Sequence, residues 1–400
     1  MHIVTSTDIL LPRAEDMGAW SVIACDQFTS EPEYWAAAEA RAAEKPSTLS
    51  LMLPEAWLHT ARADGADGRI ADTMRRYLAE GVFQTVPDSF IYVERTLSDG
   101  RVRRGLVAAL DLEQYDFTGT QRASVRSTEG TVEERLPPRV NIRRGAPLEM
   151  PHTLLLMDDQ TDSVLSLAEK AKDTLEKVYD FDLMLGGGHI AGWRVSGETK
   201  AAVQSALDAL DNAALQREKY GDAAENGKLT FAVGDGNHSL AAAKRFWEEK
   251  CETLPENERE TDPARFALVE IENIHEPSLD FEPIHRVIFD TDTSAFAVEF
   301  TAHRTEWEAE DKTLGERVAA AESFCRAYIA AHGGYIDYIH GDDTARSLGE
   351  KPNCAAVLLP PVEKSGLFLS VLKNGALPKK SFSMGNARDK RYYLECRKIR

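Results

Sequence analysis

The stretch FAVGDGNHSLAAAK, residues 231–244, constrains the fold most, because a short apolar run meets a glycine-rich turn and then a helical pattern. Apolar runs at residues 229–233 and 266–271 bracket it and predict buried strands. A strand, a helix and a second strand in this order indicate a local α/β unit. Helical and strand patterns also alternate elsewhere, so the sequence predicts a mixed α/β (α+β) protein with mixed sheets and flanking helices.

A chain of 400 residues is longer than one compact core usually needs, which favours a main region with a smaller annex. We expect a main α/β region over residues 1–290, carrying the turn, and a smaller α/β region over residues 291–400. Within the second region, apolar runs at 335–339, 354–359 and 367–372 predict strands.

Two segments of the main region have clear local patterns. Residues 68–80 predict an amphipathic helix that Gly81 stops. Residues 90–97 and 102–110 predict a β-hairpin, because they flank the turn sequence Ser-Asp-Gly-Arg.

Charge and cysteine usage limit the classes of function. A formal net charge of -19 argues against non-specific binding to nucleic acids or to anionic membranes. No apolar run is long enough for a membrane span, and the N-terminus has no signal-peptide pattern. The five cysteines are scattered and contain no CxxC, which predicts a cytoplasmic protein. The histidines lack metal-ligand spacing, so no structural zinc is expected.

Two basic islands interrupt this acidic chain. Residues 379–400 carry eight basic and two acidic side chains, a net +6, so the rest of the chain sums to -25. Residues 122–144 hold six arginines against three glutamates. One interpretation is that the islands form a site for a small phosphate-bearing molecule. The other is that each island pairs with acidic neighbours at the surface.

The GDGNH turn has the chemistry of an anion site. The backbone N–H groups at the start of a helix lack partners within the helix, and the helix dipole adds positive potential there. Gly234 and Gly236 allow close approach and unusual backbone angles. Asn237, His238 and Ser239 would present polar groups around the opening.

Standard phosphate motifs do not describe this turn. It has no P-loop lysine, and Ser239 stands where a dinucleotide fingerprint has its third glycine. Asp235 would repel a phosphate unless it holds Mg²⁺ or a hydroxyl. The structural alternative is a tight turn in which Asp235 or Asn237 is the N-cap and His238 is hydrogen-bonded locally.

The first basic island also offers catalytic groups. Arg126, Arg135 and Arg139 would clamp a phosphate or carboxylate, and Glu129 or Glu133 would act as a base or metal ligand. The alternative is an arginine–glutamate network that fixes a loop.

Two further pairs of residues lead to local predictions. Pro137 and Pro138 in the first island would end any short helix that begins before them. In FEPIHRVIF, residues 281–289, His285 and Arg286 precede an apolar run and would reach a site at the end of a strand.

These segments together resemble domain-of-unknown-function family 1015, a family of uncharacterised bacterial and archaeal proteins. The resemblance spans nearly the full length and rests on five landmarks in order: VIACDQFTSEPEYW, TEGTVEERLPPRV, VGDGNHSLAAAK, FEPIHRVIF and KKSFSMGNARDKRYYLECRKIR. The family name implies no activity.

The turn alone is distantly similar to the nucleotide-phosphate loop of the ParB and sulfiredoxin superfamily, which includes nucleotide-dependent kinases of free serine. In family 1015 the usual form of this turn is Asp-Gly-His-His-Arg. The resemblance of that form to the superfamily's loop implies a ParB/sulfiredoxin-like element around residues 229–271. Here Asn237 replaces the first His and Ser239 replaces the Arg, the main phosphate clamp. Arg135, Arg286 or Lys380 would have to substitute for it. Sulfiredoxin-like chemistry needs a cysteine that this turn lacks.

Three hypotheses follow. The first is an enzyme that binds a nucleotide or another phosphate-bearing ligand at the 234–239 turn and transfers a phosphoryl group to a small hydroxyl substrate. Mg²⁺ on Asp235 and a base at Glu129 or Glu133 would serve that reaction. The second is a non-catalytic protein that senses a nucleotide or metabolite. The third is a phosphoester hydrolase that uses Asp235 and His238.

Overall fold

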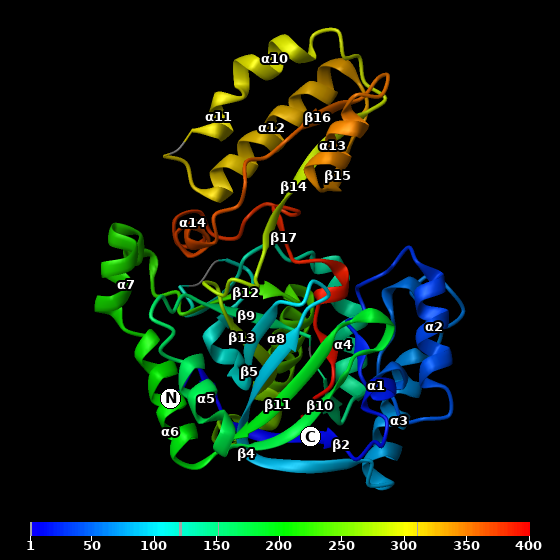
Figure 1. Ribbon diagram of the computed structural model, residues 1–400. Helices are drawn as coiled ribbons and strands as arrows, with labels where there is room; N and C mark the ends of the chain where they lie inside the picture. The colour runs from blue at the N-terminus through cyan, green and yellow to red at the C-terminus, as the bar shows by residue number, and fades with distance from the viewer. Residues whose placement is uncertain (1, 120–121, 151, 310) are drawn as a thin grey trace.

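Two sheets organise the chain, a large one of eleven strands and a small one of four, within residues 2–119, 122–150, 152–309 and 311–400, which the computed structural model describes. Helices flank both sheets (Figure 1). The predicted mixed α/β class is confirmed.

The large sheet mixes parallel and antiparallel pairs. Its main path runs, from edge to edge, through β10 (Glu176–Asp182), β11 (His189–Val195), β4 (Phe83–Thr96), β5 (Val102–Asp111), β13 (Phe266–Asn273), β9 (Leu154–Met157), β12 (Phe231–Asp235), β7 (Val125–Ser127) and β6 (Tyr115–Asp116). Off this path, β1 (Val4–Thr5) pairs with β5 and β2 (Thr7–Pro12) pairs with β4. The predicted hairpin is β4–β5. The two predicted strands around the turn are β12 and β13, and β9 lies between them.

The central strands of the large sheet are buried on both faces. Successive side chains of a strand point to opposite faces. Along β5, Leu106, Ala108 and Leu110 therefore pack into one core, which also contains Trp247, whereas Val107 packs into the other. Two apolar layers on one sheet hold the central strands rigid, and the site is built at their ends.

Among the described residues, nine α-helices precede β14 (Phe281–Phe289) and belong to the region of the large sheet. They are α1 (Met17–Trp20), α2 (Pro32–Ala42), α3 (Ala66–Ala79), α4 (Leu136–Gly145), α5 (Leu165–Ala171), α6 (Gly197–Leu210), α7 (Ala213–Tyr220), α8 (Asn237–Cys251) and α9 (Glu256–Arg259). The amphipathic helix predicted over 68–80 is α3. None of the helices in the described part of the chain is long and apolar enough to span a membrane.

The small sheet stands above the large one in Figure 1, in yellow and orange. Its central strand β14 (Phe281–Phe289) pairs with β15 (Tyr335–His340), β16 (Ala355–Val357) and β17 (Phe382–Met384). The helices after β14 are α10 (Phe296–His303), α11 (Thr305–Glu308), α12 (Leu314–His332), α13 (Asp342–Gly349) and α14 (Leu367–Asn374). A capping box of Thr313 and Glu316 starts α12. The predicted boundary at residue 290 stays a prediction, and β14 already pairs within the small sheet.

The C-terminal tail returns to the main body, as the red segment of Figure 1 shows. There β18 (Tyr392–Tyr393) pairs with β3 (Val22–Ile23), and β19 (Arg397–Lys398) pairs with β8 (Leu148–Glu149). The buried guanidinium of Arg391 lies 2.8 Å from Glu270 on β13 and 2.8 Å from Glu395. These contacts fix the tail against the large sheet.

Two local predictions were wrong. Residues 367–372 form the start of helix α14, not a strand. Leu367, Phe368, Val371 and Leu372 lie on one helical face and are buried, and a short apolar run does not distinguish that pattern from a strand. Pro137 and Pro138 do not end a helix but begin α4, because proline is tolerated in a first turn whose N–H groups have no helical partners.

Replacing Arg391 with alanine should destabilise the fold strongly. Glu270 and Glu395 are 4% and 1% exposed, so the variant would leave two buried carboxylates without this counter-charge. We expect a loss of about 3–5 kcal/mol in the free energy of unfolding, measured by urea titration. Arg304→Ala, which breaks an exposed ion pair with Glu308, is the control and should cost at most about 1 kcal/mol. Equal losses of unfolding free energy in the two variants would contradict the structural role assigned to Arg391.

Candidate functional site

The GDGNH turn closes β12 and opens α8. Gly236 is the N-cap, with the left-handed angles φ 78° and ψ 23°, so neither Asp235 nor Asn237 takes that position. A Cβ on Gly236 would lie 2.8 Å from Thr153 Cα. At Gly234 a Cβ would lie 2.6 Å from Met384 Sδ. Gly236 is therefore required by its conformation and by its contact with the backbone, whereas a side chain at Gly234 would displace Met384.

The first turn of α8 is open. No side chain caps it from Gly236, and within the described residues the backbone N–H groups of Asn237, His238 and Ser239 donate no hydrogen bond. The Oδ1 atom of Asn237 is buried and also has no hydrogen-bond partner there. The helix is held by its other face, where Leu240 and Trp247 are each 1% exposed. The helix end thus offers unpaired donors and positive potential.

A cavity of about 610 Å³ lies over this turn. Its volume is in the range of small-molecule sites. Ten of the residues predicted from the sequence line it: Glu129, Arg135, Arg139, Gly234, Asp235, Gly236, Asn237, His238, Ser239 and Lys380. The loop after β3 contributes Asp26, and the tail adds Lys390. The structure thus brings parts of both basic islands to one cavity.

Some of the positive side chains that line the cavity have no ion-pair partner among the described residues. Lys390 pairs with Asp235, and Arg139 pairs with Glu55. The side chains of Arg135, Lys379 and Lys380 also line the cavity and make no ion pair with any described residue. Two carboxylates of the lining, Asp26 and Glu129, make no ion pair with a described lysine or arginine either, so five cations face four carboxylates. In a chain of net charge -19, this local surplus of positive charge favours an anionic ligand.

Asp235 is a charged carboxylate with two local partners. Lys390 Nζ lies 3.1 Å from its Oδ2, and the N–H of Gly236 donates to its Oδ1 at 2.8 Å. Burial opposes the charged form, but the positive charge of Lys390 together with these hydrogen bonds lowers the pKa of Asp235. Lys390 therefore neutralises the carboxylate that would otherwise repel a phosphate.

His238 is a neutral ring. Its Nε2 accepts a hydrogen bond from the backbone N–H of Val132 at 3.2 Å, so the proton of the neutral ring is on Nδ1. Burial, with the positive charges of Arg139 and Arg135, lowers the pKa of His238 to about 4. At neutral pH this ring is a hydrogen-bond donor through Nδ1, not a cation.

Glu129 is the carboxyl group best suited to proton transfer. Burial raises its pKa, although the N–H of Ser381 donates to its Oε1 at 3.2 Å and Lys380 lies nearby. A carboxyl group with a raised pKa has proton-transfer behaviour closer to neutral pH. Within the described part of the chain, no group of three or more His, Cys, Asp or Glu side chains is arranged to hold a metal ion. Mg²⁺ at Asp235 stays a prediction.

The sequence matches the family described as "Protein of unknown function (DUF1015)" over residues 7–398. The chain belongs to this family. No curated protein matches it.

Three solved structures are distantly similar to this DUF1015 protein. A conserved hypothetical protein from Pyrococcus furiosus has 10% identity and a TM-score of 0.33, covering 73% of this chain and 95% of that one. A free serine kinase in complex with AMP has 10% identity and a TM-score of 0.35, covering 72% and 90%. SbnI with a C-terminal truncation from Staphylococcus aureus has 10% identity and a TM-score of 0.31, covering 70% and 82%. Likenesses this distant assign no activity to the DUF1015 protein.

Two predicted residues of the first island lie outside the cavity. Arg126 does not act as a clamp there, because its buried guanidinium donates to the backbone carbonyls of Ala123, Asn226 and Lys228 at 2.9, 3.0 and 3.2 Å. The side chain of Glu133 is 70% exposed and does not line the cavity. Arg126 thus fixes a loop through backbone carbonyls, not through the arginine–glutamate network that the alternative predicted.

His285 and Arg286 also lie outside it. Both are 0% exposed, and His285 accepts from the N–H of Leu359 at 3.1 Å and contacts Asp342 at 2.9 Å. Arg286 lies 3.2 Å from Glu322 and stacks on Tyr338. The pair holds the small sheet together instead of reaching a ligand.

The sequence reasoning missed some lining residues. His152 lies between segments distant in the chain, and its Nδ1 is 2.8 Å from the hydroxyl of Tyr393. His340 comes from the small sheet. No motif marks either histidine. Lys379 and Lys390 belong to a recognised basic island, but nothing in its composition separates them from Arg391, whose role is structural.

The left-handed conformation at Gly236 should not tolerate a side chain. We expect Gly236→Ala to lose about 2 kcal/mol or more in unfolding free energy, because the backbone strain adds to the contact with Thr153. Gly130 lines the same cavity with open space around it, so Gly130→Ala should change stability by less than about 0.5 kcal/mol. Urea titration of both variants measures the contrast. A tolerated Gly236→Ala would contradict the assigned geometry.

The lowered pKa of His238 predicts a specific pH dependence. Between its ordinary value of 6.5 and about 4, the unfolded chain binds a proton at this ring that the folded protein does not. Stability should therefore fall as the pH falls through this window, and His238→Gln should remove that part of the slope. Ring-proton NMR titration gives the pKa directly. Protonation near pH 6.5 in the folded protein would refute the prediction.

Proposed function

We propose that this protein binds a phosphate-bearing small molecule at the 234–239 turn and transfers a phosphoryl group to a hydroxyl substrate. The observation that carries the proposal is the meeting of unpaired cations with the open N-terminus of α8 in one cavity. Arg135, Lys379 and Lys380 line it, and the N–H groups that begin α8 have no partners among the described residues. Phosphoryl transfer depends on positioning and charge neutralisation, which these groups provide.

The lining residues divide the roles between them. The backbone of Asn237 and Ser239 would hold phosphate oxygens, as helix N-termini do. Lys379 and Lys380 would take the place of the arginine that the family's usual turn carries. Glu129 would accept the proton of the attacking hydroxyl as the new O–P bond forms and the bond to the leaving phosphate breaks.

A nucleotide is the proposed phosphoryl donor, since the turn resembles a nucleotide-phosphate loop. Mg²⁺ brought with the nucleotide would bind mainly phosphate and water oxygens, with Asp235 as a protein ligand. Lys390 lies 3.1 Å from that carboxylate, so metal binding would require this ion pair to open.

The geometry favours this reaction over a hydrolase based on Asp235 and His238. The Nε2 atom of His238 already accepts the N–H of Val132, and its low pKa leaves no proton to donate as an acid at neutral pH. Asp235 is paired with Lys390. Neither group is free to activate water.

Removing the unpaired lysines should weaken phosphate binding. Isothermal titration with ATP, ADP, CTP, GTP and inorganic phosphate, each with and without Mg²⁺, would identify the donor. We expect Lys379→Ala and Lys380→Ala each to raise the Kd at least about tenfold, because each removes a charge-assisted contact. Lys373→Ala, an exposed lysine outside this cavity, should leave the Kd unchanged.

Transfer-rate measurements on a second variant distinguish a catalytic function from a sensing function. Glu129→Gln should bind the donor normally but lose at least about 100-fold of its transfer rate, the usual contribution of general-base catalysis. Binding without turnover in the unmodified protein would instead support the sensing function. If none of the nucleotides or phosphate binds, the proposed function fails.

A further inference from the structure

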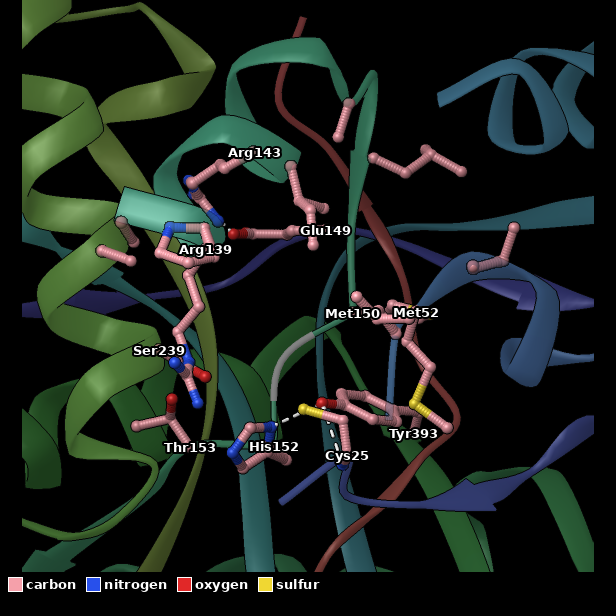
Figure 2. A pocket seen from close by; sticks show the side chains of 18 of the residues that line it. Cys25, Met52, Arg139, Arg143, Glu149, Met150, His152, Thr153, Ser239 and Tyr393 are labelled. Atoms are coloured by element: carbon pink, nitrogen blue, oxygen red, sulfur yellow. Dashed lines mark hydrogen bonds and ion pairs between the residues drawn. The ribbon is translucent and has the colours of Figure 1, made fainter. Parts of the chain in front are cut away.

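A second, apolar compartment adjoins the cavity. Glu55, Arg139, His152 and Ser239 line both spaces, so these residues form the boundary between them. Figure 2 looks into this compartment, with Arg139, Ser239 and His152 along one side and Met52 and Met150 on the other. An anion at the turn would thus lie beside an apolar space.

The compartment offers few free polar groups to a ligand. Much of its wall is methionine and aliphatic, with Met52, Met74 and Met150 from three separate segments. Its buried carboxylate, Glu149, already pairs with Arg143 and Arg397, each at 2.7 Å. Such a space suits hydrocarbon, and methionine side chains adapt to its shape.

The thiol in this compartment does not change that character. Burial raises the pKa of Cys25 to about 12, so the thiol is protonated at neutral pH. The hydroxyl of Tyr393 is engaged with His152 at 2.8 Å. Neither group supplies a reactive anion, and both add polarisable surface.

The size of the compartment is also informative. Its volume is about 170 Å³. An apolar cavity of roughly 150 Å³ holds benzene, so this one has room for about six to eight heavy atoms. A nucleobase would place its ring N–H and C=O groups against hydrocarbon and paired ions, which leaves them unsatisfied. The donor nucleotide is therefore a poor occupant.

We propose that the hydroxyl substrate carries an apolar group of about six to eight heavy atoms, and that this group fills the compartment beside the turn. The phosphorylated product is then an amphipathic phosphate ester, with its phosphate at the α8 turn and its hydrocarbon among the three methionines. This inference rests on the proposed function, because it assigns the second reactant of the same site.

A series of alkyl phosphates tests the inference as product analogues. Isothermal titration of the full-length protein would compare inorganic, methyl, butyl, hexyl and phenyl phosphate. We expect the affinity to rise about threefold to fourfold per methylene up to hexyl phosphate, because each buried methylene contributes a similar transfer free energy. Phenyl phosphate should also bind more tightly than methyl phosphate.

Filling the compartment should remove this advantage selectively. Leu53→Phe and Ile142→Phe place larger side chains at half-buried positions in its wall, so hexyl phosphate should bind only as well as methyl phosphate. Leu78 is a half-buried leucine that packs against the same apolar core but does not line the compartment, so Leu78→Phe is the matched control. It should leave the whole series unchanged.

The outcomes separate the two proposals. If methyl phosphate binds and longer chains bind no better, or if both filling variants keep the hexyl advantage, the apolar assignment is overturned and the phosphate site stands. If no phosphate compound binds, the proposed function fails and the inference fails with it.

Discussion

The buried charge contacts of the C-terminal tail are the constraint on which the site depends. Arg391 holds Glu270 of the central strand β13, and Arg397 holds Glu149, so the tail cannot shift without exposing or unpairing buried charges. Lys390 directly precedes Arg391, and this anchoring places it 3.1 Å from Asp235. The tail thereby completes a turn that lies more than a hundred residues earlier in the chain.

The local electrostatics oppose the character of the whole chain. A protein of net charge -19 repels anions at long range, yet its cavity collects Lys379, Lys380 and Arg135 beside the dipole of α8. Lys390 cancels Asp235, and burial keeps His238 neutral. The proposed anion site therefore depends on cations from distant segments that meet beside the helix N-terminus.

Sequence patterns identified the elements better than the contacts. The hairpin β4–β5, helix α3 and the strand–turn–helix at Gly236 follow from local rules that act within a few residues. The strand expected over 367–372 is helix α14, because a short apolar run fits both periods. Arg126 and Arg135 come from the same island, but one fixes a loop and the other faces the cavity, a difference of orientation that composition does not contain.

The sequence by itself determined the fold class, the glycines of the turn and the two basic islands. These properties depend on backbone sterics, apolar period and residue counts, all of which are local. The tertiary structure decided which cations line the cavity over the turn and that His152 and His340 also line it. It also placed an apolar compartment next to that cavity. Those outcomes depend on contacts between segments far apart in the chain, such as the buried ion pair between Arg391 of the tail and Glu270 of β13.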